Sequence, residues 1–283
     1  MLRNRVFSPA PEVIVEGVRS PSLGQALSEL WVYRGLVLAF AIRDLKVKYK
    51  QAIFGVAWAL LQPLGLLAVF TLLIARAVEV PSGDVPYPAF ALSTLIPWLF
   101  LQNSVSIGAQ ALLLDSVLVR KVYFPREAPI VGAVCAASVE FCVGMGLFLV
   151  LGPLLGARVG WTVLLALPLF AVVAVLAIGV SCGLGALNVY YRDVRHILPF
   201  AIQLWMFASP VIYPISAVPP AWREPYAILN PAAGLLDAFT RALASGVLPD
   251  PLLLTFSIGG TAGLAWGGYR LFKRLEPAFA DVI

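Results

Sequence analysis

The chain has 283 residues, of which 60% are hydrophobic and only 12% are charged. Soluble domains average about 25% charged residues, and a soluble fold this apolar would expose large hydrophobic patches. The composition therefore excludes an ordinary soluble enzyme, a disordered protein and a coiled coil. It predicts an all-α membrane protein with several transmembrane helices. Its 20 Lys and Arg residues outnumber its 15 Asp and Glu residues.

The N-terminal part of the chain precedes any predicted membrane span. Residues 1–21 are polar and interrupted by proline, so we predict a flexible cytoplasmic tail. Residues 22–52 carry apolar positions at helical spacing but end in the sequence R-D-L-K-V-K-Y-K, which is too charged to cross a bilayer. They predict an amphipathic helix on the cytoplasmic membrane surface, either as a plain lipid anchor or as a docking site for a partner protein.

Residues 53–283 contain the predicted transmembrane domain. A bilayer needs about 20 apolar residues per helix, and six stretches approach that length. We predict spans at residues 53–75, 87–114, 130–155, 161–187, 197–215 and 251–272. An even number of spans places both termini on one side, and 16 of the 20 basic residues fall on that side. The positive-inside rule then predicts a multi-pass protein with cytoplasmic termini.

Two connecting segments are unusual in composition. Residues 115–129 include R-K-V-Y-F-P-R, a basic and aromatic mixture that is typical of protein–protein contacts, although a plain basic loop also explains the charge. Residues 216–250 lie on the opposite side and contain a predicted helix start, with Asn230 as N-cap and Pro231 at the first helical position. This helix is too short to span a bilayer, so we predict that it dips in from the outer surface as a lid or gate.

Polar groups inside the predicted spans are candidates for function or for helix packing. Glu140 lies in the middle of the third span, where a carboxyl group either relays ions or is paired in a structural role. Gln102, Ser106 and Gln110 are spaced by four residues and share one helix face, which either joins helices or lines a hydrophilic path. Repeated small residues predict close helix contacts at Gly179 and Gly183 in the fourth span and at Gly259, Gly263 and Gly267 in the sixth.

The motifs of common catalytic sites are absent from the sequence. No glycine is followed by lysine, so there is no P-loop, and a single His excludes a zinc-peptidase motif. A G-x-S-x-G match at residues 179–183 lies inside an apolar span, where the strand-to-helix turn of a hydrolase cannot form. We therefore predict no catalytic residue, no metal site and no cofactor on this chain. Transport would draw its energy from a partner or from an ion gradient.

Several longer motifs follow one another along the chain. They are R-D-L-K-V-K-Y-K-Q at residues 43–51, F-G-V-A-W-A-L-L-Q-P at 54–63, K-V-Y-F-P-R at 121–126, N-V-Y-Y-R-D-V-R-H at 188–196, the segment 198–214, L-N-P-A-A-G-L-L-D-A-F at 229–239 and F-A-D-V-I at 279–283. Together they closely resemble the ABC-2 type permeases that export bacterial O-antigen and related cell-surface polysaccharides. The resemblance begins at about Leu27. It implies the fold of these type V ABC exporters, with six transmembrane helices, an interface helix and re-entrant gate helices.

The resemblance implies partners that the residues alone do not. Two copies of such a permease work with two separate ATP-binding subunits, which bind ATP and Mg. A channel forms between the two permeases in the bacterial inner membrane, surrounded by membrane lipid. The substrate would be an undecaprenyl-pyrophosphate-linked glycan, and no nucleic acid is involved.

The resemblance also assigns roles to individual positions. Coupling to the ATPase falls to Arg120, Lys121, Val122, Tyr123, Phe124, Pro125 and Arg126. The interface helix and the access route of the lipid pyrophosphate involve Arg43, Asp44, Lys46, Lys48, Tyr49 and Lys50. The channel lining would include Trp58, Gln62, Trp98, Phe100, Gln102, Ser106, Gln110, Trp205, Phe207 and Tyr213. The outer gate would include Trp222, Tyr226, Asn230, Leu235 and Phe239.

Three other hypotheses compete with this interpretation. An ion-coupled carrier would use Glu140 as a relay and would need no ATPase. A membrane-embedded glycosyltransferase or ligase would need clustered carboxylates or basic residues in a large loop, whereas residues 216–250 hold only scattered acidic residues. A teichoic-acid or capsule exporter of the same family would differ in substrate and not in mechanism.

Overall fold

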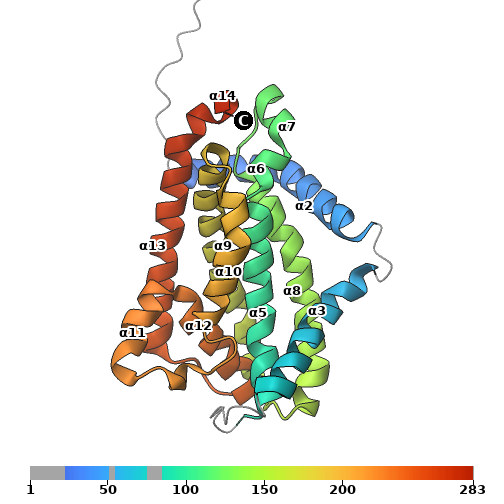
Figure 1. Ribbon diagram of the computed structural model, residues 1–283, viewed down its shortest axis with the longest axis vertical. Coiled ribbons are helices and arrows are strands. Elements are labelled where there is room, and N and C mark those ends of the chain that lie inside the picture. Colours follow the sequence, from blue (N-terminus) through green and yellow to red (C-terminus); the bar gives the residue numbers. More distant parts are fainter. Residues whose placement is uncertain (1–22, 51–54, 75–84, 283) are drawn as a thin grey trace, which may run out of the picture.

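The structure is a computed structural model that describes residues 23–50, 55–74 and 85–282. Within those ranges it is built from helices and contains no strand (Figure 1). The predicted tail, residues 1–21, lies outside the described residues. The long helices run roughly along the long axis of the molecule, and shorter helices cover its two ends (Figure 1). The all-α membrane class predicted from the composition is confirmed.

The predicted amphipathic segment forms two helices, α1 (Leu23–Val32) and α2 (Arg34–Tyr49), which meet at Tyr33. Val37 and Phe40 are buried on the face of α2 that packs against α8, because residues three apart lie on the same side of a helix. The last turns of α2 are charged, and Lys48 and Tyr49 in the final turn contact Glu140 of α8. The burial pattern therefore sets one face of α2 against the transmembrane helices.

Three of the described helical segments are long and apolar enough to cross a bilayer: α5 (Tyr87–Gly108), α8 (Ala128–Leu154) and Trp161–Tyr190, whose main part is α9 (Ala166–Tyr190). They lie at the second, third and fourth predicted spans. α13 (Pro251–Leu275) runs beside α9 at the sixth predicted span. The carboxylate of Asp250 caps α13 by accepting hydrogen bonds from two backbone amides of its first turn.

The first and fifth predicted spans contain shorter helices. α3 (Trp58–Val69) continues into a π-helical turn (Phe70–Ile74) and runs obliquely beside α5 and α8 (Figure 1). α10 (Val194–Phe207) ends well before the predicted limit at residue 215. Pro210 explains the early end, since a proline lacks the amide hydrogen that helix continuation needs. The count of six membrane crossings stays a prediction.

Short helices cover both ends of the bundle. At one end, α6 (Ala111–Leu114), α7 (Ser116–Lys121) and α14 (Phe279–Val282) lie near α1 and α2 (Figure 1). At the opposite end, α11 (Pro220–Leu229) and α12 (Pro231–Thr240) pack against α13, and a π-helical turn (Arg241–Ser245) follows α12. The predicted coupling segment (residues 115–129) and the predicted gate segment (residues 216–250) therefore lie at opposite ends of the molecule.

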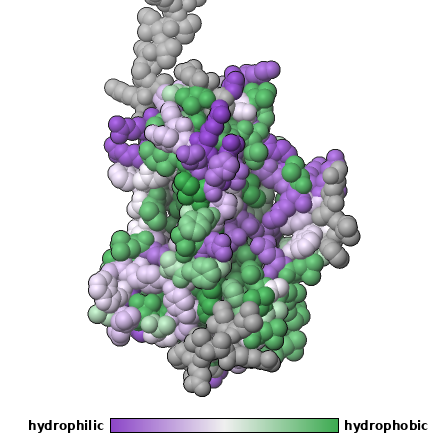
Figure 2. Space-filling model, in the orientation of Figure 1, coloured by the Kyte–Doolittle hydropathy of each residue, from purple (hydrophilic) through white to green (hydrophobic). Residues whose placement is uncertain are grey.

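Basic residues are distributed unevenly between these two ends. We call the end formed by α1, α2, α6, α7, α14 and the neighbouring ends of α9, α10 and α13 the basic end. Its cationic residues are Arg34, Arg43, Lys46, Lys48, Lys50, Arg120, Lys121, Arg126, Arg192, Arg195, Arg270, Lys273 and Arg274. The opposite end holds Arg158, Arg223 and Arg241 among the described residues. Figure 2 shows hydrophilic side chains gathered toward the basic end and over α2.

Small residues allow α9 and α13 to approach closely. A Cβ atom added to Gly179 would collide with Ala265 of α13, and one added to Gly268 would collide with the carbonyl of Gly179. Gly183 also faces Gly268, so the predicted contact face of the fourth span is confirmed. The predicted face of the sixth span is wrong, because the contact is made by Ala265 and Gly268. Among the residues that the structure describes, no neighbour within contact distance faces Gly259, Gly263 or Gly267.

The hydrophobic core surrounds α5, which is buried along most of its length. The ring of Phe100 lies 5.8 Å from Phe141 and 4.8 Å from Phe170 between centroids, and Phe239 of α12 lies 6.0 Å from Phe141. A second buried cluster lies at the basic end and includes Phe40, Phe124, Phe272 and Phe279. The two clusters divide the apolar packing between the body of the bundle and its basic end.

Candidate functional site

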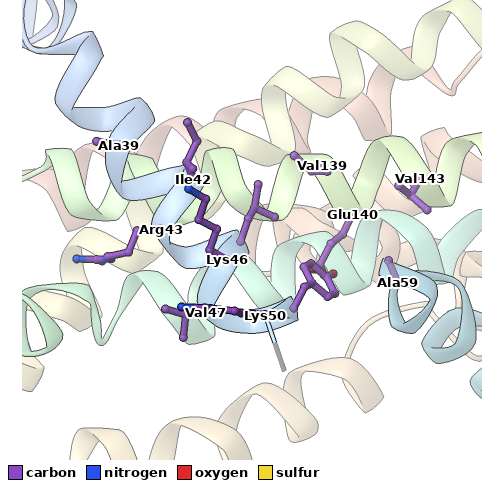
Figure 3. Close-up of a pocket in the computed structure, with 12 residues that line it drawn as sticks. Ala39, Ile42, Arg43, Lys46, Val47, Lys50, Ala59, Val139, Glu140 and Val143 are labelled. Carbon is purple, nitrogen blue, oxygen red and sulfur yellow. Dashed lines mark hydrogen bonds between the residues drawn. The ribbon is translucent and has the colours of Figure 1, made fainter. Parts of the chain in front are cut away.

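A cavity of about 1140 Å³ lies between α2, α3 and α8 (Figure 3). Its wall is mainly apolar, but Arg43, Lys46 and Lys50 of α2 border it and Glu140 of α8 faces it. Two further cavities, of about 380 and 20 Å³, also touch Glu140. Glu140 therefore lies where the hollowed regions beside α2 and α3 meet.

Both carboxylate oxygens of Glu140 have partners. Lys48 Nζ forms an ion pair with Oε1 at 2.5 Å, and the Tyr49 hydroxyl donates to the same oxygen at 2.8 Å. Asn103 Nδ2 of α5 donates to Oε2 at 2.8 Å. Burial, followed by the bond to Glu140, raises the pKa of Tyr49 above its ordinary value. Glu140 thus joins the C-terminal end of α2 to α5 and α8.

Arg43 is engaged by two carboxylates. Its guanidinium donates to both oxygens of buried Asp115, with Nη2 to Oδ2 at 3.0 Å, and to Asp44 Oδ1 at 2.8 and 3.0 Å. The hydrogen bond to Asp115 raises the pKa of Arg43, so the group stays charged. Asp115 begins the predicted coupling segment. The pair therefore fastens α2 to the segment that precedes α7.

Lys46 and Lys50 differ from the other cations at this cavity. They lie one helical turn apart on α2, both are exposed, and both border the cavity (Figure 3). In residues 23–50, 55–74 and 85–282, no carboxylate forms an ion pair with either of them. Four of the cations near this cavity are predicted to meet a pyrophosphate. Among them, Lys46 and Lys50 are exposed to solvent, whereas Arg43 and Lys48 form ion pairs with acidic side chains.

The predicted coupling segment exposes some of its residues and buries others. Arg120 and Lys121 end α7, and Val122 continues in extended backbone. Tyr123 is 80% exposed, whereas Phe124 is buried. Pro125 is also buried, and Arg126 is half-buried at the turn into α8.

Contacts join this segment to α1 and α2. The hydroxyl of Tyr123 donates to Glu29 Oε1 of α1 at 3.2 Å, and the negative charge of Glu29 raises the pKa of Tyr123. The ring of Phe124 lies 6.0 Å from the ring of Phe40 of α2. Together with the pair of Arg43 and Asp115, these contacts hold α1, α2 and the coupling segment together.

The aromatic residues predicted to line a channel differ in exposure, and Trp205 and Tyr213 are partly buried. Trp98 and Phe100 are buried inside the chain and contribute almost nothing to its surface. Trp58 and Phe207 are exposed, and Gln62 is exposed beside Trp58 at the second cavity. Trp98 and Phe100 therefore cannot contact a substrate in this conformation.

The polar stripe of α5 is partly occupied by bonds within its own helix. Trp98 Nε1 donates to Gln102 Oε1 at 3.1 Å, and Gln110 Nε2 donates to the carbonyl of Ser106 at 2.9 Å. All three predicted stripe residues are partly exposed. Part of each of these side chains therefore stays accessible at the surface of this chain.

Asn230 lies at the centre of a network in the predicted gate. It precedes α12 as predicted, but its side chain does not cap that helix. Its Oδ1 accepts from Trp205 Nε1 at 2.8 Å, and its Nδ2 donates to the carbonyl of Ala208 and to Ser209 Oγ, both at 2.9 Å. Asn230 therefore fastens the α11–α12 corner to the end of α10.

The other predicted gate residues surround this network. The hydroxyl of Tyr226 donates to the carbonyl of Ala208 and lies 3.3 Å from the hydroxyl of Tyr213. Leu235 and Phe239 are buried on α12, and Trp222 is exposed on α11. The segment thus has a packed apolar face and an exposed aromatic residue.

Sequence reasoning missed the partners of these groups. Asn103 adjoins the polar stripe, but nothing in the sequence assigns it to Glu140. In the same way, nothing in the sequence pairs Asp115 with Arg43. Glu29 and Ser209 likewise received no role. A buried ionisable residue signals that partners exist, but partners far apart in sequence become visible only when the helices are placed side by side.

The chain matches the ABC-2 type transporter family over residues 35–243. This range includes α2, the coupling segment, Glu140 and α12. The chain therefore belongs to the ABC-2 type transporter family, whose members are permease subunits of membrane transporters. The family predicted from the sequence motifs is confirmed.

The chain is similar to several named transport proteins of this family. The chain is 30% identical over 257 residues to the O-antigen export system permease protein RfbA of Myxococcus xanthus, covering 90% of this chain and 98% of the relative. It is 24% identical over 253 residues to the O-antigen export system permease protein RfbA of Klebsiella pneumoniae, covering 88% and 95%. It is 21% identical over 261 residues to the polysialic acid transport protein KpsM of Escherichia coli, covering 89% and 98%.

Proposed function

We propose that this chain is the transmembrane subunit of an ATP-driven exporter that moves a lipid-linked polysaccharide, such as O-antigen, out of the cytoplasm of a bacterium. The observation that carries the proposal is the likeness to an O-antigen export permease over 98% of that relative's length. The cavity beside the basic end of α2 supports it, since a lipid-linked anionic substrate needs an apolar wall next to positive charge. ATP and Mg would be bound by a separate subunit and not by this chain.

The basic end is the proposed docking surface for the ATP-binding subunits. Tyr123 and Val122 project from it, and Arg120 and Lys121 add positive charge beside them. An exposed aromatic residue next to basic ones has the composition of a binding hot spot. Docking there places this end, and with it both termini, on the cytoplasmic side of the inner membrane.

The cavity at α2 is the proposed first site for the pyrophosphate of an undecaprenyl-linked glycan. Lys46 and Lys50 border it without a carboxylate partner among the described residues. Arg43 and Lys48 hold Asp115 and Glu140 instead. We therefore assign the substrate charge to Lys46 and Lys50, and we assign Arg43 and Lys48 to the positioning of α2.

The translocation path itself requires a second copy of the chain in this proposal. Trp58, Gln62 and Phe207 are exposed on α3 and α10, where they are available to face a partner copy and a passing glycan. The α11–α12 segment would close the outer end of the path. Its tie to α10 through Asn230 and Trp205 links the proposed gate to a path-lining helix.

Deletion of the gene in the source bacterium tests the proposal. Surface polysaccharide should disappear while a lipid-linked glycan accumulates inside the inner membrane, and the wild-type chain should restore export only with an active ATP-binding partner. Normal surface polysaccharide in the deletion strain would refute the proposal. Chemical analysis of the retained glycan decides between an O-antigen and the second candidate, a capsule polymer or a teichoic acid. The likeness to a polysialic acid transport protein keeps a polymer other than O-antigen as a candidate.

The ion-coupled carrier is less well supported by the geometry. Glu140 accepts from Tyr49 and Asn103 and pairs with Lys48, so its oxygens are held by three groups of this chain. A relay carboxylate needs access to a moving ion. Export that continues after collapse of the ion gradient, with ATP present, would exclude the carrier.

A further inference from the structure

The F-A-D-V-I motif near the C-terminus begins with the last described helix, α14 (Phe279–Val282). After α13, a short turn (Glu276–Ala278) reverses the chain, and α14 then lies beside α7 at the basic end (Figure 1). Phe279, the first residue of the motif, has 0% of its surface exposed. Because Phe279 is buried to this extent near the C-terminal end of the chain, the packing around it must hold it in place.

Aromatic rings surround Phe279. Its ring lies 5.3 Å from the ring of Phe272 in an edge-to-face arrangement and 6.3 Å from the ring of Tyr190. Phe279 belongs to the same buried cluster as Val119 of α7 and Phe124 of the coupling segment. The motif is therefore continuous, through side-chain packing, with the segment proposed to receive the ATPase.

Polar contacts fix the turn that leads to α14. Lys273 is almost fully buried and pairs with Glu127 at 2.5 Å and with Glu276 at 2.8 Å. The hydroxyl of Tyr190 donates to the carbonyl of Leu275 at 3.0 Å. Because Glu127 precedes α8 and Tyr190 ends α9, these bonds attach the turn to the ends of two transmembrane helices.

The coupling segment needs such support from outside. α7 has six residues and α14 has four, and helices this short are not stable alone. The buried side of α7, at Val119, faces the cluster that contains Phe279. Without that ring, a displacement of Tyr123 would be absorbed by local movement of α7 and would not reach the longer helices.

We infer that the α14 segment is part of the coupling apparatus, with Phe279 as the positioning residue that braces α7 and Phe124 against the end of α13. The inference rests on the proposed function, because it assumes that an ATP-binding partner acts on Tyr123. It assigns to the end of this chain a mechanical role in addition to those of the interface helix and the coupling segment.

The test compares Phe279→Ala with Phe279→Leu and with Val282→Ala, a control at an exposed position of the same helix. Each variant is reconstituted as full chain with the ATP-binding subunit, and glycan export and ATP hydrolysis are measured per inserted complex. For Phe279→Ala we expect glycan exported per ATP hydrolysed to fall about three- to tenfold. Phe279→Leu should recover most of the ratio, and Val282→Ala should match wild type.

A second measurement separates this inference from the proposed function. Hydrogen exchange of the amides of residues 116–124 should become about tenfold faster in Phe279→Ala and remain unchanged in Val282→Ala. This readout needs no substrate, so a complex that exports no glycan at all would count against the proposed function alone. Unchanged exchange, or a wild-type export ratio per inserted complex in Phe279→Ala, would overturn the role of Phe279.

Discussion

Replacement of Glu140 by Gln distinguishes a structural carboxylate from an ion relay. Glutamine has the shape of glutamate and still accepts one hydrogen bond, from Tyr49 or Asn103, but it carries no charge for Lys48. Because the Lys48 side chain is 35% exposed, the lost ion pair contributes about 1 kcal/mol or less. The NH₂ group of glutamine also faces one of the two donors, Tyr49 or Asn103, so one charge-assisted hydrogen bond is lost as well. Together these effects give an expected loss of stability of about 1–2 kcal/mol for Glu140→Gln.

Alanine at the same position removes every acceptor. Tyr49 and Asn103 then lose their bonds to a charged partner in a half-buried site. We expect Glu140→Ala to lower the free energy of unfolding by about 3–5 kcal/mol. Val150→Ala, at an exposed apolar position of α8, controls for the effect of shortening a side chain on that helix.

Thermal unfolding of the purified chain in detergent measures these differences. We expect the midpoint of Glu140→Gln to fall by about 3–6 °C, and ATP-driven export per inserted complex to remain above half of the wild-type value. Tyr49→Phe combined with Glu140→Gln should destabilise by less than the sum of the single changes, since both alter the interaction between the same two side chains. A Glu140→Gln chain that is as stable as wild type and exports nothing would refute the structural role and favour the relay.

Three further changes test the other contacts. Replacement of both Tyr123 and Phe124 by Ala should leave the chain inserted and the partner able to hydrolyse ATP, yet abolish most export; normal export would contradict the coupling assignment. Replacement of Lys46 and Lys50 by Glu should raise the glycan concentration needed for half-maximal export about tenfold. This effect should weaken in high salt, because exposed charges are screened. An unchanged concentration dependence would count against a pyrophosphate site at α2. Asn230→Ala leaves Trp205 Nε1 without its acceptor. We expect a loss of stability of about 1–3 kcal/mol, together with leakage of small solutes through a loosened gate. A variant that is fully stable and does not leak would show that Asn230 is not part of the gate.

Sequence patterns predicted the features that depend on local composition. Charge and hydropathy located the long helices and the interface segment, because each follows from residues close together in the chain. The predictions that failed needed a neighbouring element. Gly268 rather than Gly267 meets α9 because the rotation of α13 is set by packing, and the bond of Asn230 to Trp205 replaces the cap that its position predicted.

The fifth span shows the same limit for helix length. Hydropathy continues to residue 215, but α10 ends at Phe207. The reason is Pro210, which lies three residues beyond the end of α10. High hydropathy after a proline indicates that the segment avoids water. It does not indicate that the helix continues. The end of α10 then matters for function, since the carbonyl of Ala208 becomes free to accept from Asn230 and Tyr226.

The position of α2 relates the two proposed sites to each other. Phe40 and Arg43, near its middle, contact the coupling segment through Phe124 and Asp115. Lys48 and Tyr49, near its end, hold Glu140 of α8. A helix fastened at both places moves as a unit, because bending it would break its own hydrogen bonds.

Movement of the coupling segment by a partner would therefore shift Lys46 and Lys50 as well, since they lie on the same helix between and beyond these attachments. The cavity is lined by α2 on one side and by α3 and α8 on the other. Its width must then depend on the position of α2 relative to the bundle. In the proposed exporter, one rigid element would in this way couple ATP-driven movement at Tyr123 to the affinity of the cavity for a pyrophosphate. The attachment at Glu140 would then limit how far α2 can move.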